Sequence, residues 1–175
     1  ARVFPVRGGT GESAEVGLYL GLHLVERGSV ALFCGKKEGV ISLCGRAAEI
    51  FDRAVALPRP IDVSNAAEIA RLTHLARLNL GADQDITQAS ALGILAHHGN
   101  TPQGLRLSVE YAMREGHAKF VICTSTLAQG VNFPIRYLIV SATQQGREKI
   151  KVRDFHNLMG RAGRAGMHTE GSVIF

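Results

Sequence analysis

Short apolar runs alternate with longer stretches in which apolar residues recur at helical spacing, and this alternation limits the possible folds more than any other feature. The strand-like runs occupy residues 29–34, 93–97, 119–123 and 136–140. The helical patterns occupy residues 13–27, 38–55, 64–80 and 101–115. Buried strands separated by helices form parallel sheets with helices against their faces. We therefore predict one α/β domain with a mostly parallel sheet flanked by helices on both faces.

Two of the predicted helices have recognisable starts. Ser64, with Asn65 beside it, is a good N-cap for the helix that follows. Thr101 and Pro102 predict an N-cap followed by a proline at the first helical position. Residues 1–28 are expected to form a linker and a lead-in helix.

The composition is that of an ordinary soluble globular domain of 175 residues, with 46% hydrophobic and 20% charged residues. The formal charge of +5 agrees with a polyanionic partner but does not require one. No apolar run approaches the roughly 20 residues of a membrane span, and the N-terminus has no secretory-signal pattern. The cysteines lack CxxC spacing, so we expect buried reduced thiols at Cys34 and Cys123 and, by default, a cytoplasmic protein.

Polar segments follow three of the predicted strands. They are Lys36–Lys37, His97–Asn100 and Thr124–Pro134. In open parallel sheets, ligands bind outside the carboxyl ends of the strands. Hydroxyls, amides and accessible backbone are the groups that hold a phosphodiester chain. Each segment alone could be a solvated loop, but three segments at one edge favour a ligand site.

A glycine-rich segment near the C-terminus, residues 160–166, carries Arg161 and Arg164. Arginines three residues apart on a helical turn share one face. Two guanidiniums on one face suit a bidentate clamp on phosphate oxygens. The alternative is a glycine-rich loop with two solvated arginines.

Several of these segments resemble the motifs of superfamily 2 helicases. Residues 123–134, CTSTLAQGVNFP, are similar to motif V in the GVNxP form of the Ski-like and related DExH branches, and residues 157–164, NLMGRAGR, are similar to motif VI. Residues 97–99, with Arg106, Val109 and Glu110, resemble the segment before motif V, and residues 30–37 resemble motif IV. The resemblance implies the second RecA-like domain of a helicase, a fold related to the P-loop NTPases.

The same resemblance implies roles for individual residues. In that family two RecA-like domains face each other across an ATP cleft, and nucleic acid runs over both. Arg164 and Arg161 would reach the γ-phosphate of ATP, with its Mg²⁺, held by the N-terminal RecA-like domain of the same polypeptide, and Arg164 is the better candidate for the arginine finger. Gly130, Asn132 and Asn157 fall at positions that approach the nucleotide. The positions expected to line the path of single-stranded DNA or RNA are Thr124, Ser125, His98, Gly99, Arg106 and Lys36.

The chain departs from the usual motifs at several positions. Asn157 replaces the usual Gln or His at the start of motif VI, and lysines replace the usual arginine of motif IV. Gln129 and Asn132 stand where DEAD-box proteins have Arg and Asp, which favours the DExH side.

Two ATP-binding motifs are absent from the sequence. It contains no GxxxxGK[ST] and no DExx box, and the glycine-rich residues 8–13 lack the required lysine. We therefore expect half of an ATP-hydrolysing helicase, inactive alone. Because the sequence begins at Ala1 and ends inside a strand-like run, it looks like a fragment of a longer protein.

Other functions are less well supported. One alternative is a non-catalytic nucleic-acid-binding or regulatory module that retains the fold, and another is an unrelated α/β protein that binds a small nucleotide. No metal site is expected, because His97 and His98 should point to opposite sides of an extended chain and have no further ligands nearby in the sequence. The absence of GxSxG argues against a serine hydrolase.

Overall fold

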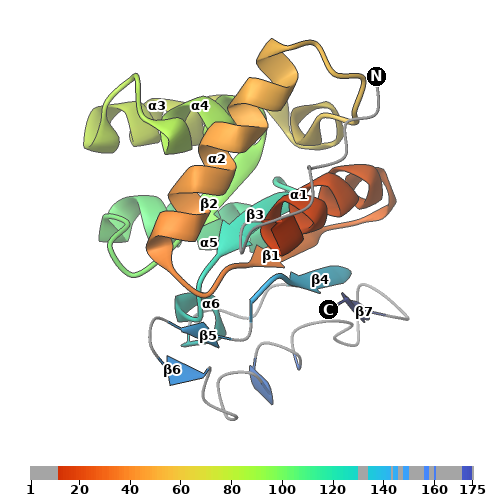
Figure 1. The fold of residues 1–175 in the computed structure, drawn as a ribbon. Helices are drawn as coiled ribbons and strands as arrows, with labels where there is room; N and C mark the ends of the chain where they lie inside the picture. The colour runs from red at the N-terminus through yellow and green to blue at the C-terminus, as the bar shows by residue number, and fades with distance from the viewer. Residues whose placement is uncertain are drawn as a thin grey trace.

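The core of the molecule is a five-stranded parallel sheet (Figure 1). The computed structural model describes residues 12–129, 134–142, 144–145, 148–149, 156–157, 160 and 171–174. Strand order in the sheet is β2-β3-β1-β4-β7, and each pair of neighbours is parallel. The strands are β1 (Val30–Phe33), β2 (Ile94–His97), β3 (Phe120–Cys123), β4 (Tyr137–Val140) and β7 (Ser172–Ile174). The predicted parallel sheet is confirmed.

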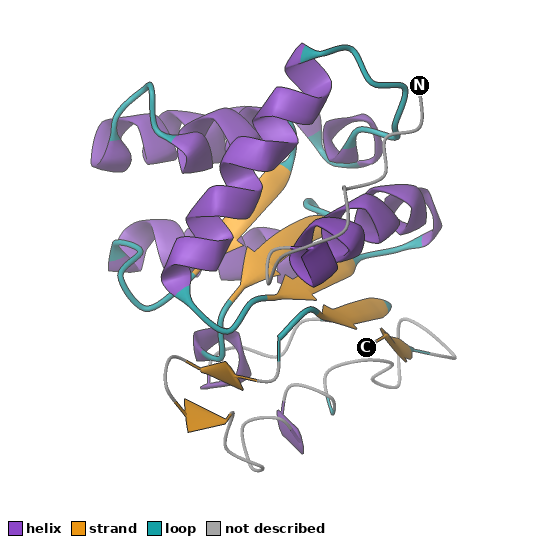
Figure 2. Ribbon diagram, in the orientation of Figure 1, coloured by secondary structure: helices purple, strands orange, loops and turns teal. Residues whose placement is uncertain are grey.

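Helices cover both faces of this sheet, as Figure 2 shows. On one face lie α1 (Glu12–Leu24), α2 (Lys37–Asp52) and α4 (Asp85–Ala91), whose apolar residues pack in one cluster. On the other face lie α3 (Ala66–Leu80) and α5 (Gln103–Arg114), which pack in a second cluster. The described residues also form the short helices η1 (Val25–Arg27), η2 (Pro60–Val63) and α6 (Thr126–Gln129), and the antiparallel pair β5 (Gln144–Gln145) and β6 (Glu148–Lys149).

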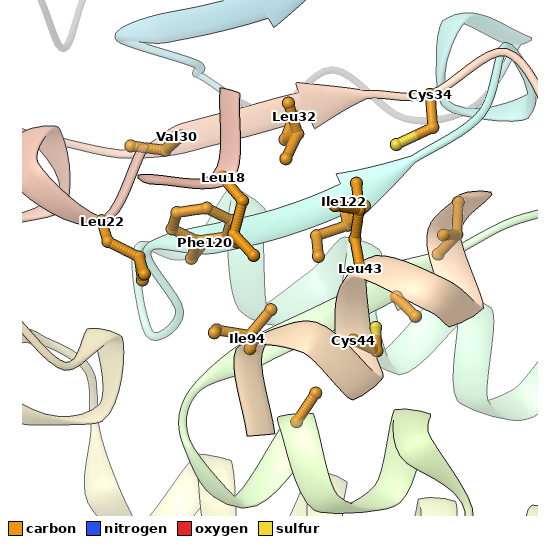
Figure 3. Packing of buried hydrophobic residues seen from close by; sticks show 14 of the residues in the cluster. Leu18, Leu22, Val30, Leu32, Cys34, Leu43, Cys44, Ile94, Phe120 and Ile122 are labelled. Carbon is orange, nitrogen blue, oxygen red and sulfur yellow. The ribbon is translucent and has the colours of Figure 1, made fainter. Parts of the chain in front are cut away.

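Side chains alternate between the two clusters along each central strand, as the pleat of a strand requires. In β1, Val30 and Leu32 pack against α1 and α2, whereas Ala31 and Phe33 pack on the α3 and α5 side. Figure 3 shows the first of these clusters, with Phe120 of β3 beside α1. The strand-like runs are continuously apolar because both faces of the sheet are buried.

Two glycines permit close approaches between elements. A Cβ on Gly21 of α1 would lie 2.8 Å from the Phe120 ring, so this helix packs directly on β3. Gly93 begins the entry to β2 with φ +79, and a Cβ there would lie 2.5 Å from the backbone nitrogen of Ile61. Gly93 therefore allows η2 to contact the start of β2, where Ile61 N donates to Leu92 O.

The structure corrects the helix starts predicted from the sequence. The N-cap of α3 is Asn65, whose side chain accepts from Glu68 N, whereas the Ser64 hydroxyl donates to Pro60 O. At α5 the N-cap is Pro102, and the first helical residue is Gln103. Thr101 does not cap this helix, because its hydroxyl accepts from His98 N at 3.4 Å.

The structure also tests the predicted state of the cysteines and shows whether any described helix could span a membrane. Cys34, Cys44 and Cys123 are free and buried, as expected from the sequence for the first and last. Burial raises the pKa of the Cys34 thiol to about 12. Among the helices described, none is long and apolar enough to cross a bilayer.

Candidate functional site at the carboxyl edge of the sheet

The three polar segments predicted to share an edge do lie together. They follow β1, β2 and β3, which are adjacent and parallel. The backbone joins them just beyond the strands: Cys34 N donates to Cys123 O at 2.7 Å, and Thr124 N donates to His97 O at 3.1 Å. We call the positions Lys36–Lys37, His97–Asn100 and Thr124–Thr126 the carboxyl edge.

A buried set of side-chain hydrogen bonds lies at this edge. His97 Nε2 is 2.7 Å from Glu110 Oε1 on α5, and His97 Nδ1 is 3.3 Å from Thr126 Oγ1 at the start of α6. Thr126 Oγ1 is in turn 3.1 Å from Thr124 Oγ1. We call these four residues the polar chain. It links β2, α5 and the segment that follows β3.

Burial favours the neutral form of the His97 ring over its protonated form. Burial lowers the pKa of His97, while the hydrogen bond and charge of Glu110 act in the opposite direction and the charge of Arg106 lowers the pKa further. Arg106 and Glu110 are four residues apart on α5 and so share one face of this helix.

His98 is buried, and its ring has no hydrogen-bond partner in the part of the chain that the structure describes. The residue is 5% exposed, and among the described residues neither Nδ1 nor Nε2 has a partner. Burial lowers its pKa; the positive charge that His97 would carry when protonated and the charge of Lys37 lower the pKa further, and Glu38 acts in the opposite direction. The charges of Lys37 and Glu38 come from the start of α2, on the face of the sheet opposite α5. The two adjacent histidines therefore face different layers of the fold, as predicted.

The other residues predicted to bind single-stranded nucleic acid differ in accessibility. Lys36, the N-cap of α2, is exposed, and its side chain makes no capping bond. Gly99 is exposed, and a Cβ there would lie 3.4 Å from the Thr126 methyl. Arg106 is half-buried, whereas Thr124 and Ser125 are buried at 8% and 1% exposure. The structure thus brings these residues to one edge, and their contact with a ligand stays a prediction.

The predicted ATP-facing residues lie mostly outside the described residues. Gly130, Asn132, Arg161 and Arg164 fall outside them. Asn157 is described as an exposed residue in a helical turn. The nucleotide roles of all five residues stay predictions.

The sequence motifs suggested no separate role for two members of the polar chain, Glu110 and Thr126. A signal for Glu110 was available: it interrupts the buried apolar stripe of α5, formed with Leu105, Val109 and Met113. A carboxylate in such a stripe needs a buried polar partner.

A cavity of about 1260 Å³ lies elsewhere, between α1, the C-terminal half of α2, α4 and η2. None of the predicted site residues that the structure describes lines this cavity. Across the described residues there is no group of three or more His, Cys, Asp and Glu side chains that could hold a metal ion.

Comparison with known proteins finds a family match over the part of the chain that contains the predicted helicase motifs. The family model described as the helicase conserved C-terminal domain matches residues 69–166, which include β2, α5, β3 and the carboxyl-edge residues that follow β2 and β3. This chain belongs to the helicase C-terminal domain family. It is the C-terminal helicase domain of a superfamily 2 helicase, as the motifs predicted.

Relatives and one solved structure extend this comparison. Helicase POLQ-like of Caenorhabditis elegans is 35% identical over 154 residues, which is 86% of this chain and 16% of the relative. ATP-dependent DNA helicase Hel308 of Aeropyrum pernix is 38% identical over 95 residues, 52% of this chain and 13% of the relative. The crystal structure of the DUF1998 helicase MrfA bound to DNA and AMPPNP matches with a TM-score of 0.57 and 18% identity, over 99% of this chain and 18% of that one. The fold is therefore RecA-like, and the chain spans less than a quarter of the length of these proteins.

Proposed function

We propose that this chain is the second motor domain of an ATP-dependent nucleic-acid helicase or translocase. Its carboxyl edge grips the backbone of a single strand, and Arg164, with Arg161, reaches ATP and Mg²⁺ held mainly by a first RecA-like domain of the same polypeptide. The names of the relatives support this proposal, since Hel308 is an ATP-dependent DNA helicase and the MrfA structure contains DNA and an ATP analogue. Single-stranded DNA is accordingly the first ligand to test.

The main support for nucleic-acid binding is the His98 ring, which has no hydrogen-bond partner among the residues that the structure describes. A buried polar group without a hydrogen bond costs about 1–3 kcal/mol, so such groups are rare in folded proteins. This ring lies at the carboxyl edge, where parallel sheets bind ligands, and near the positive charge of Lys37. A phosphate oxygen accepts hydrogen bonds and is negatively charged, so it would satisfy both a ring N–H of His98 and the lysine.

The arginine part of the proposal rests on the motif and on the chemistry of phosphoryl transfer. Hydrolysis increases negative charge on the oxygens around the γ-phosphorus, and a guanidinium held there stabilises the transition state. A finger supplied from a second domain acts only when the two domains close, which links hydrolysis to the grip on the strand. Closing on ATP and opening after hydrolysis would then produce stepwise movement.

Strand binding is tested with the full-length polypeptide and a fluorescently labelled single-stranded oligonucleotide. Its affinity should fall as salt increases, because phosphate contacts release counterions. His98→Leu, an apolar replacement of similar size, should weaken binding about tenfold, which corresponds to about 1.4 kcal/mol.

The same preparation distinguishes the rival function. Strand-stimulated ATP hydrolysis supports a motor, whereas strand binding without hydrolysis supports a non-catalytic nucleic-acid-binding module. Binding that is absent, or that does not change with salt, contradicts the proposed strand grip.

A further inference from the structure

The polar chain has a fixed direction of hydrogen-bond donation. A carboxylate can only accept, so His97 Nε2 carries the ring proton and donates to Glu110. Because the ring is neutral, Nδ1 is an acceptor, and the Thr126 hydroxyl donates to it. Thr126 then has no proton for Thr124, so the Thr124 hydroxyl donates to Thr126. Glu110 thus sets the orientation of every bond in the chain.

This arrangement fixes the end of β2. The His97 ring is held from both sides, by α5 through Glu110 and by the start of α6 through Thr126. Successive side chains of an extended chain point to opposite faces. Holding the His97 ring on the α5 side therefore keeps the next side chain, His98, on the α2 side, near Lys37.

We propose that Glu110 is a positioning residue for strand binding: acting through His97, it holds His98 at the carboxyl edge in the orientation that binds the strand. The proposal rests on the proposed function, because it assumes that His98 contacts the strand. Glu110 itself is only 5% exposed and lies on α5, so it acts on the strand only through His97.

A purely structural role for Glu110 is the competing explanation. A buried carboxylate bonded to a histidine stabilises the fold whether or not a strand binds. The two explanations differ in one respect. A positioning residue loses its effect on strand affinity when His98 is removed, whereas a residue that acts only on stability has an effect independent of His98.

A double-mutant cycle on the full-length polypeptide separates them. The variants are Glu110→Gln, His98→Leu and the double variant, and the measurements are the dissociation constant for a labelled single-stranded DNA and the midpoint of thermal unfolding. We expect Glu110→Gln to weaken binding about fivefold and His98→Leu about tenfold, with the double variant no weaker than His98→Leu alone. An additive loss of about fiftyfold, or no loss in Glu110→Gln, overturns the inference.

Thr126 offers a second test that keeps the buried carboxylate in place. Thr126→Val removes the hydroxyl that bonds to His97 but preserves the shape of the side chain, and should weaken strand binding about threefold to fivefold. Thr126→Ser retains the hydroxyl and should restore the affinity. Because no cation is removed, the salt dependence should not change in either variant.

Thr73→Val is the matched control. Its hydroxyl donates to Ile69 O within α3, away from the carboxyl edge, so strand affinity should equal that of the wild type. If the wild-type protein shows no salt-dependent binding of a single strand, the proposed function itself is wrong and the inference is overturned with it. If the wild type binds and Thr126→Val binds equally well, only the inference is overturned.

Discussion

Both ring nitrogens of His97 are hydrogen-bonded within the fold, whereas neither ring nitrogen of its neighbour His98 has a partner among the described residues. The two side chains are buried to a similar degree, so burial alone does not explain the difference. The fold itself hydrogen-bonds one histidine, and in the proposed function the nucleic acid supplies the partner of the other. This contrast is the basis of both the proposed strand site and the positioning role of Glu110.

Acidification should destabilise this chain through the two histidines. Burial lowers the pKa of His97 and of His98 below the ordinary value of 6.5 that each regains on unfolding. The unfolded chain therefore binds more protons as the pH falls below about 6.5, and the free energy of unfolding decreases there. The stabilisation is fully present above that pH and falls by up to about 1.4 kcal/mol per pH unit for each histidine.

Urea unfolding between pH 5 and pH 8 measures this dependence. His98→Leu should flatten the pH profile and, by removing an unsatisfied buried group, raise the free energy of unfolding at pH 7 by about 1 kcal/mol. Thr73→Val, which changes no titratable group, provides the control and should leave the shape of the profile unchanged. A wild-type profile that is flat from pH 8 to pH 5 would contradict the lowered pKa values of both His97 and His98.

Removing the charge of Lys36 should weaken strand binding in a salt-dependent way. The plot of log affinity against log salt should become less steep by about 0.7, the value for one lost phosphate contact on a single strand. The fold should be unaffected, because the exposed Lys36 side chain makes no capping bond to α2. Arg77→Ala, on the exposed surface of α3, removes the same charge elsewhere and should leave the slope as it is. Equal slopes for Lys36→Ala and the wild type would show that Lys36 does not contact the nucleic-acid backbone.

Loss of the proposed arginine finger should abolish hydrolysis without unfolding the protein. In the full-length polypeptide, Arg164→Ala should reduce strand-stimulated ATP turnover by about 10³- to 10⁵-fold, the range measured for arginine fingers. Steady-state phosphate release and a thermal unfolding curve provide the two readouts. Arg71→Ala, an exposed arginine of α3 that pairs with Glu68, is the control. Undiminished turnover in Arg164→Ala would show that the finger is another residue.

Gly93 and Gly104 should respond oppositely to the same substitution. Gly93→Ala forces a side chain into a φ of +79 and against the backbone of Ile61, so it should destabilise the fold by about 1–3 kcal/mol. Gly104 lies in α5, and a Cβ there would meet nothing within 4 Å, so Gly104→Ala should stabilise the fold by up to about 1 kcal/mol. Guanidinium unfolding of both variants checks the pair. Similar destabilisation by both would contradict the close contact between η2 and β2.

The central sheet was predictable from the sequence because its strands are apolar on both faces. Helix α4 was not predicted, since Thr87 and Ser90 occupy buried positions in it and obscure the apolar pattern. Their hydroxyls donate to Gly81 O and Ile86 O, so they are satisfied without polar surroundings. A hydrogen bond to a backbone carbonyl leaves no trace in the hydrophobic pattern of a sequence.

The candidate site was predictable to a similar extent. Parallel connectivity was sufficient to place Lys36, His98 and Thr124 at one edge, because strand ends coincide in a parallel sheet. The roles of Glu110 and Thr126 depend on contacts between α5, β2 and α6, which tertiary packing determines. Sequence spacing carries no direct record of such contacts.

The pairing of β4 with β7 has a mechanical consequence for the proposed finger. The chain leaves the sheet after Val140 and returns at Ser172, beside Arg136, whose carbonyl oxygen accepts from Ser172 N. The segment that contains Arg161 and Arg164 therefore begins and ends at neighbouring strands of one sheet. If the domain rotates as one body in the proposed cycle, Val140 and Ser172 move together.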